Sequence, residues 1–187
     1  MVELIVSSQA IEEQPSEVIA VFFFEDERPL RSEARLVDWL MGGMISSRIS
    51  QRLMTGKLLE TTLIPANENV KADKILFVGL GEKMAFCYER VRELAEKVVK
   101  TCLGLQVYDV LMTFPNPQQF GLDWGKLIEA LLEGIGLGFG SSKGHGNIRV
   151  RFSGGSAYCD QIIRGVQLVK NSLKNPFPLK ISREPPS

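Results

Sequence analysis

Two kinds of hydrophobic pattern alternate along the chain. Short β-branched and aromatic runs bounded by charged or proline-containing connectors predict strands, and longer stretches with an apolar residue at every third or fourth position predict amphipathic helices. The predicted strands span residues 2–6, 18–24, 58–64, 74–78, 107–114 and 148–152, and the predicted helices span residues 32–53, 85–103, 122–139 and 156–173. This alternation predicts an α/β domain, a three-layer sandwich with helices on both faces of a sheet.

Four segments carry more detailed expectations. The run at 18–24 is apolar on both faces, which predicts a central strand. Gly42 and Gly43 interrupt the helix at 32–53, so we expect it to bend or restart there. Because the connector between the first two strands is short, we expect those strands to pair antiparallel. The alternation of apolar and basic residues at 148–152 predicts a half-exposed edge strand.

Composition narrows the function classes. At 187 residues, the chain has the length of one ordinary domain. Its 22 Lys+Arg balance 22 Asp+Glu, so no net charge attracts nucleic acid, and a nucleic-acid partner is not expected. No basic leader precedes an apolar run, and no stretch approaches the roughly 20 apolar residues of a membrane span. Three widely spaced cysteines, Cys87, Cys102 and Cys159, predict reduced core thiols, so we expect a soluble cytoplasmic protein.

Two glycine-rich segments are candidate ligand sites. A predicted strand runs directly into Gly79-Leu-Gly81, but the third glycine of a dinucleotide fingerprint is missing because Met84 stands there. A tight strand-to-helix turn is the preferred interpretation, with phosphate binding as the alternative. The glycines at 134, 136, 138 and 140 end a predicted helix and precede a small basic loop. The candidate ligand-binding residues are Gly79, Gly81, Gly140, Lys143 and His145.

The sequence offers little for catalysis or metal binding. His145 is the only histidine, and no serine or cysteine occupies a recognisable nucleophile motif. Clustered zinc ligands are missing as well, so we expect neither a catalytic residue, nor a metal, nor a cofactor. Arg149 and Arg151 share one side of a predicted strand, and Arg164 lies on the next helix. These three form the candidate nucleic-acid contact, although edge strands also carry charge to prevent association with other sheets.

An ordered series of motifs carries a resemblance to a known family. The series consists of Val21 to Glu27 (Val-Phe-Phe-Phe-Glu-Asp-Glu), Met41-Gly-Gly-Met44, Gly56 to Pro65 (Gly-Lys-Leu-Leu-Glu-Thr-Thr-Leu-Ile-Pro), Lys74 to Lys83 (Lys-Ile-Leu-Phe-Val-Gly-Leu-Gly-Glu-Lys) and Glu129 to Gly140. Across residues 17–145 the chain resembles the N-terminal domain of the leucyl aminopeptidase family, the cytosol aminopeptidases that carry two metal ions. The resemblance implies a fold similar to macro domains, with a mixed sheet between helices.

The same resemblance implies what this chain lacks. The family's metal ligands and catalytic residues lie in a separate C-terminal domain around Asn-Thr-Asp-Ala-Glu-Gly-Arg, and no such run occurs here. We therefore expect a family-like domain at 1–155, followed at 156–187 by a helix and a proline-rich tail that resemble the start of the family's interdomain linker. No catalytic residue is carried over.

These expectations define three hypotheses. In the family, this domain supports the oligomer and, in some members, contacts nucleic acid. The leading hypothesis is therefore a stand-alone non-catalytic domain that acts in self-association or binds a partner, such as a separately made peptidase chain. The alternative is a macro-domain-like binder of a nucleotide or an ADP-ribose-type ligand, in a cleft between Gly79-Leu-Gly81 and the loop at 140–146. The third is nucleic-acid contact or a role as one subunit of a split metal-dependent aminopeptidase.

Overall fold

The fold is a seven-stranded sheet between two helical layers. A computed structural model describes residues 1–141, 146–154, 156–169 and 177–183. The strands are β1 (Val2–Ser7), β2 (Ser16–Phe23), β3 (Thr61–Pro65), β4 (Ala72–Gly79), β5 (Asp109–Met112), β6 (Ile148–Ser153) and β7 (Leu179–Arg183). The helices are α1 (Ser32–Leu40), α2 (Met44–Ser50), α3 (Tyr88–Gly104), α4 (Trp124–Gly140) and α5 (Ser156–Val169), with short 3-10 turns η1 (Ile11–Glu13), η2 (Lys83–Ala85) and η3 (Pro117–Phe120).

The strand order is β3-β4-β2-β5-β6-β1-β7. Among the described strands, only β3 runs antiparallel to its neighbour, and the other pairings are parallel. The mixed sheet and the three layers confirm the predicted fold class. β2 lies between β4 and β5 with both of its faces covered, as its continuous apolar run predicts.

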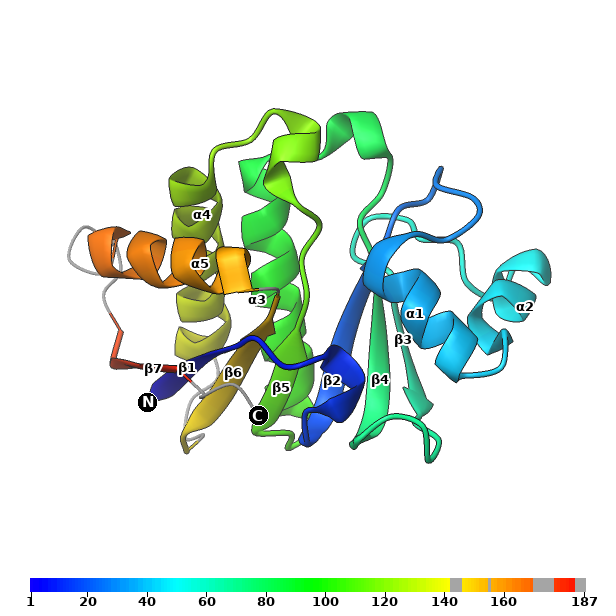
Figure 1. The fold of residues 1–187 in the computed structure, drawn as a ribbon, viewed down its shortest axis with the longest axis horizontal. Helices are drawn as coiled ribbons and strands as arrows, with labels where there is room; N and C mark the ends of the chain where they lie inside the picture. The colour runs from blue at the N-terminus through cyan, green and yellow to red at the C-terminus, as the bar shows by residue number, and fades with distance from the viewer. Residues whose placement is uncertain (142–145, 155, 170–176, 184–187) are drawn as a thin grey trace.

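The expected antiparallel pairing of the first two strands is wrong. β1 pairs with β6 and β7, and two strands separate it from β2. Because β1 and β2 point the same way, the connector at 8–15 must return from one end of the sheet to the other (Figure 1). It packs Ile11 into the core on the α1 and α2 side.

The expected edge position of 148–152 is also wrong, because β6 lies between β5 and β1. Its alternation has a different cause. Ile148, Val150 and Phe152 face the core under α3, α4 and α5, whereas Arg149 and Arg151 face the other side of the sheet. There they meet carboxylates instead of a helix.

The two helical layers cover the sheet unequally. One core contains α3, α4 and α5 against β1, β2, β4, β5 and β6, and the other contains α1 and α2 against β2, β3, β4 and Leu111 of β5. Figure 1 shows α1 and α2 at one end of the molecule, next to β2, β4 and β3. In the described part of the chain, no helix covers the second face of β6, β1 and β7.

Glycines set two local features. Gly42 and Gly43 both have positive φ, 67° and 77°, and they divide the predicted helix at 32–53 into α1 and α2 as expected. α4 continues through its glycines to Gly140. A Cβ on Gly134 would lie 2.2 Å from the Arg92 carbonyl oxygen, so these glycines permit α3 and α4 to pack closely.

The residues after 155 extend the same sheet and core. Val166 and Val169 of α5 belong to the larger core, and β7 adds a strand beside β1. The sequence division at residue 155 therefore does not coincide with a break in packing. The end of the predicted helix at 170–173 lies outside the described residues.

Candidate functional site

The carboxyl ends of β2 and β5 form a topological switch point. The two strands are neighbours, but the chain leaves β2 toward α1 on one face and leaves β5 toward η3 and α4 on the other. In open α/β sheets, the crevice between two such diverging loops is where ligands bind. The loops after β4 and β5, which carry η2 and η3, lie together at the top of Figure 1.

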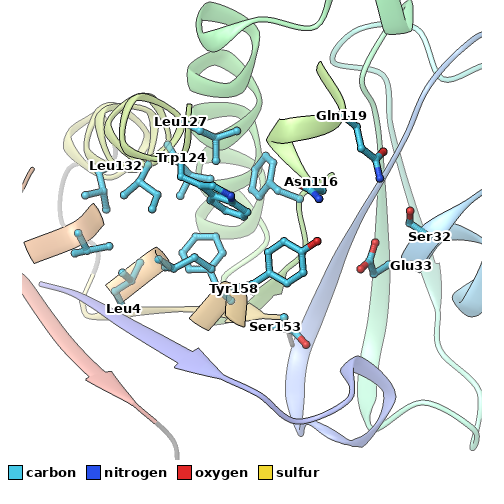
Figure 2. Close-up of a pocket in the computed structure, with 17 residues that line it drawn as sticks. Leu4, Ser32, Glu33, Asn116, Gln119, Trp124, Leu127, Leu132, Ser153 and Tyr158 are labelled. Atoms are coloured by element: carbon cyan, nitrogen blue, oxygen red, sulfur yellow. The ribbon is translucent and has the colours of Figure 1, made fainter. Parts of the chain in front are cut away.

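A cavity of about 170 Å³ opens beside this point. Its interior is apolar and is built by α4, α5, the middle of β1, the end of β6 and the loop after β5. The apolar lining residues are Leu4, Phe114, Trp124, Leu127, Ile128, Leu131, Leu132, Phe152, Ile162 and Val166. Figure 2 shows Leu4, Trp124, Leu127 and Leu132 on one side of the cavity, and the polar side chains of Ser32, Glu33 and Gln119 on the other.

Trp124 and Tyr158 form the aromatic part of the wall. Their ring centroids are 5.4 Å apart and the rings are inclined by 58°, so they contact each other directly. Trp124 is the first residue of α4, and Asp123 caps that helix by accepting from the Lys126 N–H at 3.0 Å. The Asp123 N–H in turn donates to the Tyr88 hydroxyl at 2.8 Å. This contact ties the position of the Trp124 ring to α3 as well as to α4.

Aromatic packing fixes the loop between β5 and α4. Phe114 stacks on Phe22 with centroids 4.5 Å apart, and Phe120 lies 4.9 Å from Phe86. Asn116 caps η3 by accepting from the Gln118 N–H at 3.0 Å. The loop therefore presents Asn116 and Gln119 to the cavity from a rigid support (Figure 2).

The cavity mouth carries polar groups whose hydrogen-bonding capacity is not used. In Figure 2 the Tyr158 hydroxyl points toward the side where Ser32 and Glu33 of α1 lie. Within the described residues, no hydrogen bond or ion pair involves the side chains of Ser32, Glu33, Gln119 or Tyr158. Ser32 has a φ of 50°, a strained backbone for a residue other than glycine. Strain and unpaired polar groups at one cavity are characteristic of binding sites.

A second, smaller cavity of about 110 Å³ adjoins the first and shares Ser32, Glu33 and Gln119 with it. Its charged lining includes Arg31, Glu27 and Lys83, and the Lys83 ammonium pairs with Glu27 at 2.9 Å. Together the two cavities can hold a ligand with an apolar part and a polar part.

Gly79 and Gly81 lie at the carboxyl end of β4, and their amides are engaged within the protein. The N–H groups of Gly79, Leu80 and Gly81 donate to the carbonyls of Glu60, Phe23 and Gly56, each at 2.9 Å. Gly81 has a φ of 74°, which the turn requires. These three N–H groups are therefore not available to a phosphate, and the geometry agrees with the tight turn that the sequence favours.

Gly140 lies at the other end of the sheet, where α4 ends and β6 begins (Figure 1). Among the described residues, the structure does not bring Gly140 together with Gly79 and Gly81; residues 142–145 of the expected cleft lie outside the described ranges. Lys143 and His145 lie outside the described residues.

Arg149 and Arg151 are engaged by acidic side chains. Arg151 Nε lies 2.8 Å from Asp109 Oδ1, and Arg149 contacts Asp109 at 2.9 Å and Glu3 at 3.3 Å. Hydrogen bonds from Lys180 and then from Arg149 lower the pKa of Glu3. The hydrogen bond to Asp109 raises the pKa of Arg149. Arg164 is exposed on α5, on the opposite side of the sheet, so the structure does not bring the three arginines into one strip.

The cysteines match their interpretation as free thiols. Burial raises the pKa of Cys102 to about 12 and also raises the pKa of Cys159, whereas Cys87 is half-buried. Across the described ranges, no group of three or more His, Cys, Asp or Glu side chains is placed to hold a metal ion. None of the described helices is long and apolar enough to cross a membrane.

Sequence reasoning missed the residues that line the cavity mouth. Glu33 and Tyr158 at the mouth, and Trp124 in the wall behind it, fall within predicted helices and belong to no recognisable motif. One pattern in the sequence could have located this site. A polar loop follows each of two apolar strands, and both loops lie at the same edge of the sheet because the carboxyl ends of parallel strands meet there.

The fold is that of a macro domain. Over 89% of this chain and 82% of the other, the structure aligns with the macro domain of ganglioside induced differentiation associated protein 2 (GDAP2) at a TM-score of 0.69 and 12% identity. It also aligns with a tomato leucine aminopeptidase mutant, K354E, at a TM-score of 0.61 and 14% identity, over 88% of this chain but 35% of that one. An Oceanobacillus iheyensis macrodomain mutant, G37V with ADPR, aligns at 0.62 with 8% identity, over 88% of this chain and 91% of that one.

The sequence comparisons identify a family as well as a fold. The model of the cytosol aminopeptidase family, N-terminal domain, matches residues 18–139, and the chain belongs to this family. It is 28% identical to a probable cytosol aminopeptidase of Sulfurihydrogenibium over 64% of its length, and 30% identical to the cytosol aminopeptidase of Pseudomonas aeruginosa over 58%. The match covers only 24% and 23% of those two relatives. The family resemblance noted in the sequence is confirmed.

Proposed function

We propose that this chain is a non-catalytic binding module that takes a small ligand of nucleoside or nucleotide type, ADP-ribose included, in the cavity beside Trp124 and Tyr158. The observation that carries the proposal is the cavity itself. It lies at a switch point of the sheet, its interior is apolar, and its mouth holds several polar groups without partners in the described structure.

The size of the cavity limits what enters it. Its volume of about 170 Å³ is close to the roughly 150 Å³ of an engineered apolar cavity that binds benzene. One aromatic ring therefore fits inside, next to Trp124, and the rest of the ligand extends along the mouth toward the second cavity. Aromatic stacking on a side chain contributes about 1–3 kcal/mol per nucleobase in other proteins.

Two further observations support this proposal. Several structural neighbours are macro domains, and one of them is described with ADPR, although an identity of 8% relates only the folds. The family match covers only the N-terminal domain, so we propose no peptidase activity for this chain alone. Because relatives are named cytosol aminopeptidases, we also propose a cytoplasmic location.

Titration calorimetry with ADP-ribose, adenosine and common nucleotides tests the proposal. We expect heat of binding with at least one of them, and an affinity at least about tenfold lower in Trp124→Ala, because a stacking surface is lost. Trp39→Ala is the matched control, since Trp39 is 75% exposed and lines neither cavity. No heat with any probe, or unchanged binding by Trp124→Ala, would contradict the proposal.

A second candidate function is association with another chain, either a second copy or a separately made peptidase chain. It is favoured by the charged second face of β6, β1 and β7, where the Arg149 and Lys180 side chains are 43% and 61% exposed and no described helix covers them. Light scattering after size-exclusion chromatography tests self-association, and co-elution with a peptidase domain tests the other form. A monomer that co-elutes with no such domain would end this candidate. Nucleic-acid contact stays a prediction, which the pairing of Arg149 and Arg151 with carboxylates does not favour.

A further inference from the structure

One acidic side chain lies where the two cavities meet. Glu33 lines both of them and is half-buried. Of the described residues that line the larger cavity, Glu33 is the only one with a charged side chain. Its carboxylate makes no hydrogen bond or ion pair with the described residues. Any ligand that fills the cavity must therefore place some group next to an uncompensated negative charge.

The neighbouring cations do not neutralise that charge. Lys83 pairs with Glu27 at 2.9 Å, and Arg31 is exposed and lines only the smaller cavity. The apolar wall on the other side of the larger cavity lowers the local dielectric response, which strengthens the field of the carboxylate. An ionised carboxylate only accepts hydrogen bonds, so it attracts hydroxyl and amino groups and repels phosphate.

We propose that Glu33 determines the specificity of this site. It selects ligands whose groups next to the ring donate hydrogen bonds, such as a ribose diol or an amine, and it rejects ligands that carry a phosphate at that position. A phosphate farther along the ligand is tolerated only on the Arg31 side, in the smaller cavity. This inference rests on the proposed function and names the ligand chemistry of the same site.

Glu33 also has a structural effect on α1, and Glu89 in α3 is the matched control for that effect. Glu33 is the second residue of α1, and a carboxylate in the first turn stabilises a helix through its dipole. Glu89 is the second residue of α3 and lines neither of the two cavities. Glu33→Gln and Glu89→Gln therefore remove the same charge from equivalent helix positions, and only the first variant changes the cavity.

Calorimetry with adenosine and adenosine 2′-monophosphate, which carries its phosphate on the ribose diol, tests the assignment on the full chain. We expect the native chain to bind adenosine at least about tenfold more tightly than the monophosphate. Glu33→Gln brings the two affinities within about threefold, mainly by tightening the monophosphate, and Glu89→Gln leaves the native ratio unchanged. Added salt should reduce the native preference, because it screens the carboxylate at the open mouth.

The outcomes separate this inference from the proposed function. If both probes bind and Trp124→Ala weakens both, but their ratio does not respond to Glu33→Gln, only the role of Glu33 is overturned. Equal or tighter binding of the monophosphate by the native chain overturns it as well. If neither probe nor ADP-ribose binds, the proposed function fails and this inference fails with it.

Discussion

At Gly79, the loop before β3 packs directly against the backbone of β4. A Cβ at this position would lie 2.0 Å from the Lys57 carbonyl oxygen and 2.5 Å from the Gly56 carbonyl carbon. Both contacts are with backbone, which cannot move aside as a flexible side chain does. The Leu59 N–H also donates to the Gly79 carbonyl oxygen at 3.0 Å. The glycine is thus required for packing, which explains its place in the motif without a ligand.

Gly79→Ala should destabilise the fold strongly. We expect a loss of at least about 3 kcal/mol in the free energy of unfolding, because overpacking against fixed backbone forces the strand or the loop to shift. Urea denaturation measures this loss. Gly104→Ala is the control: a Cβ there meets nothing within 4 Å, and we expect a gain of up to about 1 kcal/mol in the helix. A Gly79→Ala variant within about 1 kcal/mol of the native chain would refute this packing argument.

At the residue scale, the sequence predicted which face of a strand a side chain occupies better than it predicted what that side chain contacts. Arg149 and Arg151 lie on one side of a strand as predicted, but the partners of Arg149, Asp109 and Glu3, lie 40 and 146 positions from it in the chain. Such contacts depend on sheet order, which local patterns do not contain. Glu33 was not noticed for the same reason, because its environment comes from α4, α5 and η3.

At the scale of elements, a ladder of ion pairs connects β7, β1, β6 and β5. It runs from Lys180 to Glu3, Arg149, Asp109 and Arg151, with contacts between 2.8 and 3.3 Å. These pairs lie on the face of the sheet that no described helix covers. They give each charged side chain a partner, on strands whose other face is buried in the core. Their contribution to stability should depend on pH through Glu3.

The lowered pKa of Glu3 determines the direction in which this contribution to stability changes with pH. The folded state favours its carboxylate, so the contribution is complete above the ordinary pKa of 4.5 and is lost as the pH falls through the lowered value. We expect Glu3→Gln to cost up to about 1 kcal/mol near neutral pH, and this difference should shrink below about pH 4. Urea unfolding from about pH 7 to 3 measures it, with the exposed Glu13→Gln as the control. A constant difference across that range would contradict the ladder.

Most elements could be predicted because periodicity is a local property. The helices α3 and α4 and the strands β2 and β4 fall where their apolar spacing placed them, and the Gly42-Gly43 break is where expected. β7 was missed, since a short alternating segment in a proline-rich tail becomes a strand only through its pairing with β1. The position of β6 was wrong because a bare sheet face and an edge strand produce the same alternation of charge.

For the whole molecule, sheet order determines where a ligand can bind. The chain leaves β2 and β5 toward opposite faces, and the adjoining cavity is closed by α4, α5 and the start of α1. The sequence-based cleft combined segments from opposite ends of the sheet, because two glycine-rich turns look alike in sequence whichever end they occupy. The family's N-terminal domain thus carries a cavity of its own in this chain.

Backbone amide chemical shifts, followed by NMR during titration with adenosine and ADP-ribose, test the location of this site most directly. We expect saturable shifts concentrated at 31–33, 114–124, 153–154 and 158, the described residues around the cavity, with smaller changes near Gly79 and Gly140. Shifts centred on the opposite end of the sheet, around Gly140 and Gly146, or no saturable shifts with either probe, would contradict it.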